Sequence, residues 1–276
     1  RIIVDRQIDC RRLMSFFKLF RIIILLSIFF VILVGTWMNQ RRLASWDRPI
    51  WVTIYPMAAN DDMETAKYAK SVDLAAVNDI NPFFERNLGF YGVSLTPPIQ
   101  FQIAPVSTEL PPAIPDRHSP LSIALWSLRM RWWSWRMDVN DRLVSADIQV
   151  FVLYHALGGK SEMTMSVGMR KGMYGLVKAY ASRQANAQNQ ITIAHELLHV
   201  LGATDKYVFA TGEPEYPFGY AEPNRRPLFP QARAEIMGGR IPLSAFESVY
   251  PKSLADSMIG HETAEEIGLM AQFEKH

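Results

Sequence analysis

The chain has 276 residues, a formal net charge of +2 and 49% hydrophobic residues. Its length allows one domain of catalytic size and a short additional segment. The small net charge, with no general basic patch, argues against nucleic acid as a partner. The single cysteine, Cys10, excludes an internal disulfide framework, so a packed core, a metal or a membrane must stabilise the structure.

An uncharged stretch near the N-terminus predicts a membrane-spanning helix. Residues 22–38 carry no charge and follow further apolar side chains, which is long enough to cross the hydrocarbon. A cleaved signal peptide is the alternative, but residues 34–38 offer no small-x-small cleavage site, so we expect an uncleaved anchor. Residues 1–21 would form a short tail before it. If Met14 is the true start, residues 1–13 are not native.

The basic residues around this anchor predict its orientation. Six Lys or Arg side chains precede residue 22 and three follow residue 38 closely, which places the N-terminus inside. A start at Met14 would leave two against three and remove that preference. A short tail followed by a large domain still favours a domain outside the cytoplasm. In a bacterium this location is the periplasmic face of the inner membrane.

A polar linker, residues 39–48, leads into a domain that we expect to span residues 49–276. Residues 50–56 are rich in β-branched and aromatic side chains and predict a first strand. A helical pattern follows over residues 61–78, and residues 100–104 predict a second strand. Prolines on both sides of that strand limit its length.

A tryptophan-rich helix is predicted over residues 119–137. It contains four of the seven tryptophans, interleaved with arginines. One apolar stripe with helical spacing predicts the side that faces the core, and it consists of Leu121, Leu125, Leu128, Trp132 and Trp135. Three other apolar residues fall off this stripe: Trp126, Met130 and Trp133. The favoured interpretation is a buried amphipathic helix with solvated arginines; contact with the membrane interface is the alternative.

Two further strands precede the most informative part of the sequence. Residues 147–154 are the most strand-like of the chain and predict a central strand. A glycine- and methionine-rich region, 158–175, follows it. Residues 176–181 then predict another strand, after which the polar residues 186–190 lead towards a helix.

The segment 195–205, with the sequence HELLHVLGATD, predicts a metal site. His195 and His199 are four residues apart, so on a helix both imidazoles lie on one face and can reach a single ion. A catalytic zinc has three protein ligands and a water in the fourth position. Glu196 can sit beside that water and accept its proton, which makes it the candidate general base.

The third ligand follows from the glycine after the helix. Gly202 is suited to end a helix in the left-handed conformation, so the chain can turn sharply three residues after His199. Such a turn brings Asp205 back under the helix, where its carboxylate completes a His-His-Asp set. A turn aspartate that faces solvent is the alternative.

These residues resemble the metzincin metallopeptidases, whose motif is a zinc-binding helix, a glycine turn and a third ligand. The chain differs from most members because Asp205 stands where a third histidine is usual, although some members use aspartate. The resemblance implies a tight turn with a methionine under the metal, for which Met237 in the segment EIMGG is the candidate. It also implies an edge strand that pairs with the substrate backbone, here within residues 161–181.

The resemblance further implies a tyrosine that stabilises the oxyanion. Many metzincins supply it two residues after the turn methionine, where this chain has Gly239. Tyr207 and Tyr250 are the available substitutes. The fold it implies is α+β, a metzincin-like domain with a mixed twisted sheet, an active-site helix and a Met-turn.

A second metal arrangement remains open at the C-terminus, where residues 261–273 predict a final helix. His261 could be a ligand there, or a glutamate could serve as the distant third ligand of a gluzincin-type peptidase, the candidates being Glu262, Glu265 and Glu266. Helical carboxylates more often form a solvated face.

The sequence thus predicts a membrane-anchored zinc metallopeptidase that hydrolyses peptide or protein substrates. A zinc amidase that uses the same water chemistry on a non-protein substrate is the nearest alternative. A non-catalytic anchored module that keeps the metal for structure is the other. Glu196 argues against that module, since a structural zinc needs no base and usually closes its fourth position.

Overall fold

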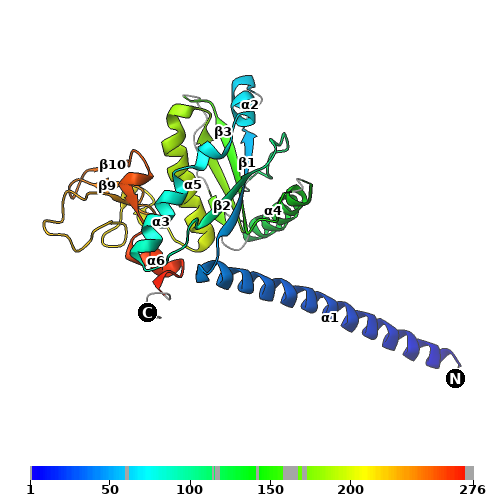
Figure 1. Cartoon of the computed structure of the whole chain (residues 1–276). Coiled ribbons are helices and arrows are strands. Elements are labelled where there is room, and N and C mark those ends of the chain that lie inside the picture. The colour runs from blue at the N-terminus through cyan, green and yellow to red at the C-terminus, as the bar shows by residue number, and fades with distance from the viewer. Residues whose placement is uncertain are drawn as a thin grey trace. The chain divides into compact units, whose positions relative to one another are not determined.

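The computed structural model describes residues 2–59, 62–113, 115, 119–140, 143–157, 167–169 and 173–270. The chain divides into two compact units, Arg1–Leu43 and Ala44–His276. Figure 1 shows the elements of both.

The first unit is formed by one long helix. Helix α1 begins at Ile2 and continues to Ser45, just beyond the unit boundary. Within the described residues, its portion from Lys18 onward is the one helix long and apolar enough to cross a membrane, and the apolar window is exposed. A long apolar N-terminal helix is therefore confirmed. It also includes most of residues 39–48, which the sequence suggested as a linker.

A five-stranded mixed sheet forms the centre of the second unit (Figure 1). Its strand order is β2-β1-β3-β5-β4, with β4 antiparallel to β5 and the other neighbours parallel. The predicted central strand is confirmed as β3. The strands are β1 (Ile50–Ala58), β2 (Ile99–Ile103), β3 (Ile148–His155), β4 (Val167–Met169) and β5 (Tyr174–Tyr180).

Helices cover both faces of this sheet, and this explains why β1 and β3 are almost wholly buried. On one face, helix α4 (Pro120–Asn140) packs against alternate residues of the strands, among them Tyr55 and Phe151. The indole of Trp133 lies 4.6 Å from the ring of Phe151, between centroids. Helix α5 (Asn186–Leu201) covers β3, β5 and β4 on the opposite face.

The helix predicted over residues 61–78 is wrong as a single element. The structure has α2 (Met63–Lys70) followed by a short 3-10 helix, η1 (Leu74–Val77). The break arises because two polar side chains end one helix and start the next. The Ser71 hydroxyl donates to the Tyr68 carbonyl at the end of α2. The Asp73 carboxylate accepts from the Ala75 amide at the start of η1.

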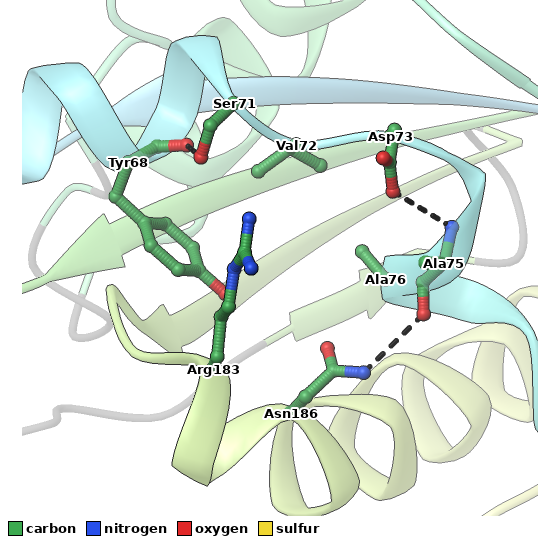
Figure 2. Close-up of a pocket in the computed structure, with 8 residues that line it drawn as sticks. All are labelled: Tyr68, Ser71, Val72, Asp73, Ala75, Ala76, Arg183 and Asn186. Atoms are coloured by element: carbon green, nitrogen blue, oxygen red, sulfur yellow. Dashed lines mark hydrogen bonds between the residues drawn. The ribbon is translucent and has the colours of Figure 1, made fainter.

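A pocket of about 300 Å³ lies between these helices and the start of α5 (Figure 2). Asp73 and Ser71 line it, but both side chains already cap helix ends. Asn186 donates to the Ala75 carbonyl across the pocket at 3.3 Å. Asn186 therefore joins α5 to η1, and the polar groups of this pocket serve structural contacts.

Helix α3 (Ile80–Phe90) was not expected from the sequence. It carries Pro82 in its first turn and Gly89 near its end, and both residues weaken a helical pattern. Proline is nevertheless tolerated in the first turn, where its missing N–H is not needed. Five of the eleven residues of α3 are buried, so packing stabilises the helix.

The prediction for the buried side of α4 is wrong. The structure buries Met130, Trp133 and Met137, with Trp126 partly buried, and exposes the stripe that was expected to face the core. Both sets of residues have helical spacing, so periodicity alone could not choose between them. Apolar packing against the sheet holds the buried set, and two hydrogen bonds add to it: the Trp133 indole donates to Glu109, and that of Trp126 donates to the Pro112 carbonyl.

The C-terminal part consists of short strand pairs and a short helix. Helix α6 (His261–Glu266) is shorter than the helix predicted up to residue 273, and residues 271–273 lie outside the described part of the chain. Gly268 has φ +84° and approaches the Ala44 carbonyl so closely that a Cβ would lie 2.4 Å from that oxygen. The strands are β6 (Tyr207–Val208), β7 (Glu213–Pro214), β8 (Ala234–Glu235), β9 (Ile241–Pro242), β10 (Ser248–Val249) and β11 (Ser257–Met258).

Candidate metal centre

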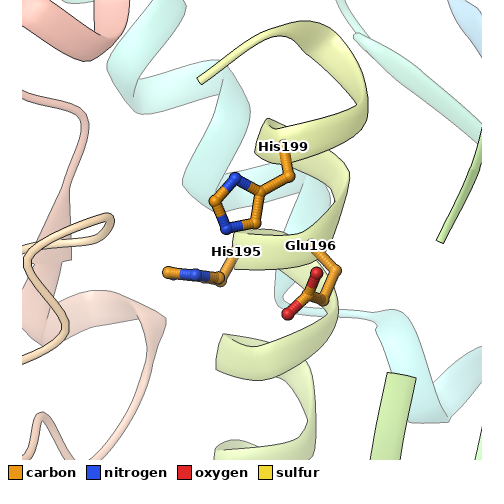
Figure 3. Close-up of side chains that lie close together, drawn as sticks. All are labelled: His195, Glu196 and His199. Carbon is orange, nitrogen blue, oxygen red and sulfur yellow. The ribbon is translucent and has the colours of Figure 1, made fainter. Parts of the chain in front are cut away.

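Helix α5 carries the two histidines and the glutamate, and their side chains project to one side of it (Figure 3). The helix begins at Asn186, so residues 186–190 belong to it rather than leading up to it. Asn189 forms two hydrogen bonds of 2.9 Å with the backbone of Tyr180 in β5. Gln190 accepts from the Asp79 amide at 2.7 Å. These buried amides fix the start of α5 against the sheet, and so fix where the histidines lie.

Each imidazole is oriented by a backbone carbonyl. His195 Nδ1 donates to the Ile236 carbonyl at 3.0 Å, and His199 Nδ1 donates to the Ala203 carbonyl at 2.9 Å. A proton on Nδ1 leaves the lone pair of the neutral ring on Nε2. Metal-binding histidines show this same outer hydrogen bond, which sets their tautomer and raises their basicity.

The third predicted ligand lies opposite both rings. Asp205 Oδ1 is 3.2 Å from His195 Nε2 and 3.1 Å from His199 Nε2. The turn that brings it there begins at Gly202, which has φ 125° and donates to the carbonyls of Leu198 and His199. The structure therefore brings together the three residues that the sequence proposed as ligands.

The pKa values of Asp205 and His195 each depend on the charged groups beside them. Burial would raise the pKa of Asp205, but hydrogen bonds from His195 and His199 outweigh it and hold that pKa well below its usual range. Burial likewise lowers the pKa of His195, but the hydrogen bond to Asp205 and the charge of Glu196 outweigh burial and raise it. The site thus favours positive charge between the histidines and the carboxylate, as protons or as a cation.

Glu196 lies beside the histidines and is only 4% exposed. The candidate ligand atoms of His195, Glu196 and His199 all lie within 4.8 Å of one another. Gly175 of β5 faces Glu196 of α5 where the helix packs on the sheet, and a Cβ on the glycine would be 3.9 Å from that of the glutamate. The carboxylate is therefore held against the sheet, next to the point where the imidazoles converge.

The segment EIMGG forms a tight turn beneath His195. The amides of Gly238 and Gly239 both donate to the Glu235 carbonyl at 3.0 Å. Met237 is fully buried, and its carbonyl accepts from the Lys206 amide at 2.9 Å, next to Asp205. Because the Ile236 carbonyl also accepts from His195, this turn supports two of the three candidate ligands through its backbone.

A buried carboxylate, Glu235, holds the turn in place. It accepts from the Gly238 amide at 2.7 Å, from the Gly260 amide at 3.1 Å and from the Thr263 hydroxyl at 2.7 Å. Burial nevertheless raises the pKa of Glu235. The role of Glu235 could not be predicted from the sequence, because a lone glutamate carries no spacing signal.

A second carboxylate, Glu266 of α6, clamps the loop that carries Asp205. It pairs with the buried ammonium of Lys206 at 2.7 Å and accepts from the Thr204 amide at 3.0 Å. Burial would raise the pKa of Glu266, but the hydrogen bonds from Lys206 and Thr204 lower it overall. Glu266 thus positions the residues on both sides of Asp205.

The side chains proposed as third ligand in the gluzincin-type alternative make other contacts. Glu266 is engaged with Lys206, while Glu262 and His261 line a separate groove of about 450 Å³ with Phe218 and Tyr220. Glu265 is exposed on α6. None of these side chains is placed with His195 and His199 as Asp205 is.

The two tyrosine candidates have different surroundings. Burial, the charge of Asp205 and a hydrogen bond to its carboxylate raise the pKa of Tyr207 to about 12, so this phenol stays protonated at neutral pH beside the cluster. The Tyr250 hydroxyl instead accepts from Arg240 at 2.8 Å, and its ring packs beneath the same guanidinium. Tyr207 is therefore the tyrosine that the structure places at the site.

Comparisons with known proteins identify no family. No protein-family model and no curated protein matches the chain. A solved structure described as a chaperone-substrate complex is similar over 82% of this chain, with 15% identical residues and a TM-score of 0.42. The matched part is 34% of that chain, so this protein spans about a third of its length. A similarity at this level supports no conclusion about fold or function.

Proposed function

We propose that this chain is a zinc-dependent metallopeptidase that α1 anchors in a membrane. The observation that carries the proposal is the convergence of His195 Nε2, His199 Nε2 and Asp205 Oδ1, at 3.2 and 3.1 Å from the carboxylate oxygen to the two nitrogens. Both histidines donate through Nδ1 to carbonyls, so in the neutral rings three lone pairs face one another. A cation between them removes that repulsion.

The donor set fits zinc. Zinc bonds of roughly 2.0–2.1 Å in a tetrahedral arrangement separate neighbouring ligand atoms by roughly 3.3 Å, close to the separations between Asp205 and the histidines. Two imidazoles and one carboxylate also form a common set for a catalytic zinc, with one position left open. A purely structural site would use that position and would not need a buried acid such as Glu196 beside it.

The arrangement of elements supports a metzincin-like domain. The mixed sheet has an antiparallel edge strand, β4, next to β5, and the helix with the histidines follows directly. The turn with Met237 supports His195 and the residue after Asp205. Its Ile236 carbonyl accepts from the His195 ring, and its Met237 carbonyl accepts from the Lys206 amide. β4 falls within residues 161–181, where we expect the strand that pairs with substrate; residues 161–166 and 170–172 lie outside the described part of the chain.

The proposed chemistry is hydrolysis of a peptide bond by water. When bound, zinc would supply Lewis-acid chemistry, lowering the pKa of a water towards about 7 and polarising the scissile carbonyl. His195, His199 and Asp205 would hold the metal. Glu196 accepts the water proton on its carboxylate and later donates it to the leaving amine. Tyr207 keeps its phenolic proton at neutral pH and can donate a hydrogen bond to the developing oxyanion.

The proposed location follows from α1. The apolar portion of α1 is exposed along its length, as a helix that packs against lipid would be. Near its C-terminal end the Arg41 guanidinium lies 4.1 Å from the Trp37 ring centroid, a pair of residue types that favours the membrane–water boundary. With the N-terminus inside, the domain from Ala44 would act on peptides outside the cytoplasm, at the periplasmic face of the inner membrane in a bacterium.

Zinc content tests the metal site. The full chain, purified in detergent, should contain about one zinc per chain, and Asp205→Ala should lose most of it because one of three protein ligands is removed. Glu222→Gln, which changes a carboxylate in an exposed ion pair with Arg225, should leave zinc unchanged. Zinc retained in Asp205→Ala would contradict the proposed ligand set. A folded parent without zinc would overturn the hydrolase proposal.

Glu196→Gln tests the catalytic role. The amide keeps the size of the side chain but cannot accept the proton, so cleavage of a peptide library should fall by orders of magnitude while zinc content stays unchanged. Unchanged cleavage would contradict the mechanism. Cleavage of small amides without cleavage of peptides would favour the amidase alternative.

A further inference from the structure

Helix α4 carries an exposed apolar stripe on the side that faces away from the sheet. The side chains of this stripe are between 57% and 70% exposed. They recur at helical spacing along nearly the whole helix, and they are Leu121, Leu125, Leu128, Trp132 and Trp135. Scattered exposed apolar residues are normal, but a continuous stripe that contains two tryptophans marks an interaction surface.

The chemistry of this stripe matches a membrane–water boundary. Its C-terminal half is rich in tryptophan and arginine, with Arg129 exposed among the apolar residues. The Arg136 guanidinium, which also pairs with Glu109, lies 4.9 Å from the Trp132 ring centroid. Tryptophan rings favour the headgroup level, leucine favours the acyl boundary, and arginine attracts anionic lipid.

The position of the stripe in the domain is also informative. The Ser134 hydroxyl donates to Gln149 at the start of β3, and Gln149 is paired with Thr53 of β1. The tryptophan end of α4 therefore lies at the edge of the sheet where β1 begins. α1 ends at Ser45 and β1 begins at Ile50. The chain therefore enters the sheet at this edge, shortly after the apolar helix.

We propose that the exposed stripe of α4 lies in the headgroup region of the membrane that α1 spans, as a second attachment of the domain. This inference rests on the membrane anchor in the proposed function. Residues 39–49 join the predicted membrane-spanning segment to β1, so the chain keeps this edge of the sheet near the lipid surface. Two attachments hold the domain in one orientation, and the site then acts on segments close to the bilayer.

The experiment uses the full chain with Cys10→Ser, placed at one chain per lipid nanodisc made of equal amounts of phosphatidylcholine and phosphatidylglycerol. Single cysteines carry an environment-sensitive fluorophore, and lipids with a nitroxide near the headgroup or deep in the acyl chain quench it. The test position is Leu128→Cys on the stripe. Phe246→Cys, which is fully exposed on another surface, is the matched control, and Ile28→Cys reports on α1.

We expect the nitroxide near the headgroup to quench the label at position 128 at least about twofold more than the label at 246. The deep nitroxide should quench the label at position 28. Equal quenching at 128 and 246, with strong quenching at 28, would overturn the inference and leave the anchor intact. An unquenched label at 28 would instead overturn the anchor.

A second copy of the chain is the other occupant that the stripe could accept. If the label at 128 is shielded only in nanodiscs that hold two chains, the stripe is a contact between copies and the inference is wrong. Leu128→Glu provides an independent check, because a carboxylate on the stripe should increase the accessibility of a label at Leu125→Cys to a water-soluble quencher. No change in that accessibility would also contradict lipid contact.

Discussion

Helices α4 and α5 cover opposite faces of the same sheet, and they use their side chains in different ways. In α5, Asn189 and Gln190 bond to neighbouring backbone and His195 is oriented by a carbonyl of a distant turn. In α4, one apolar stripe is buried and another is exposed. Polar contacts with fixed geometry thus determine the position of α5, whereas apolar packing chiefly holds α4 and leaves its outer face exposed.

Adjacent tryptophans of α4 give the sharpest test of this contrast. Trp133→Ala should lower the free energy of unfolding by about 3–5 kcal/mol, because it removes a fully packed ring beside Phe151. Trp132→Ala, one residue away, should change it by no more than about 0.5 kcal/mol in detergent. Chemical unfolding followed by near-ultraviolet circular dichroism measures both. Equal losses in the two variants would contradict the assignment of the buried side.

Near the site on α5, the ion pair between Glu266 and Lys206 should contribute to the free energy of unfolding through its charges. Glu266→Gln leaves the ammonium of Lys206, which is almost wholly buried, without its carboxylate. Because Glu266 itself is partly exposed, we expect a loss of about 2–3 kcal/mol at neutral pH, below the usual cost of breaking a fully buried pair. Glu265→Gln, on the exposed side of α6, is the control and should change little.

The pH dependence of this loss has a definite sign. The folded pKa of Glu266 is lowered below its ordinary value of 4.5, so its contribution is present above that value and is lost as pH falls through the folded pKa. The stability difference between the parent and Glu266→Gln should therefore shrink below about pH 4. A difference that stays constant down to pH 2 would show that the side chain acts through packing instead.

The sequence predicted that the three candidate ligands lie together, because their spacing has a geometric meaning. Two histidines four apart share a helix face, and Gly202 does begin the turn that brings Asp205 towards them. The strands were also predictable, since β1 and β3 are buried on both faces and read as continuous apolar runs. Local sequence patterns were therefore sufficient where residues close in the sequence determine the secondary structure or the relative position of side chains.

The rest depended on contacts between residues far apart in the chain. Glu235 and Glu266 act through partners in other segments, and neither has a motif. For α4, the sequence offered two apolar stripes, and Glu109 binding to Trp133 helps decide which is buried. The helix over 61–78 divides because Ser71 and Asp73 cap adjacent ends, a competition between side chain and backbone that periodicity does not measure.

The smallest expected effect concerns Met237 and tests how the turn supports the site. Met237→Leu conserves volume and should cost less than about 1.5 kcal/mol of stability. Zinc content should not change, because the turn reaches His195 and Lys206 through the carbonyls of Ile236 and Met237. Gly238→Ala is the contrasting variant, since its Cβ would lie 2.4 Å from the Gly219 carbonyl oxygen and must displace the turn. Loss of zinc in Met237→Leu, measured by metal analysis beside Gly238→Ala, would show that the thioether side chain itself supports the metal. That result would weaken the contrast with α4, because packing of one apolar side chain would then control the polar site as well.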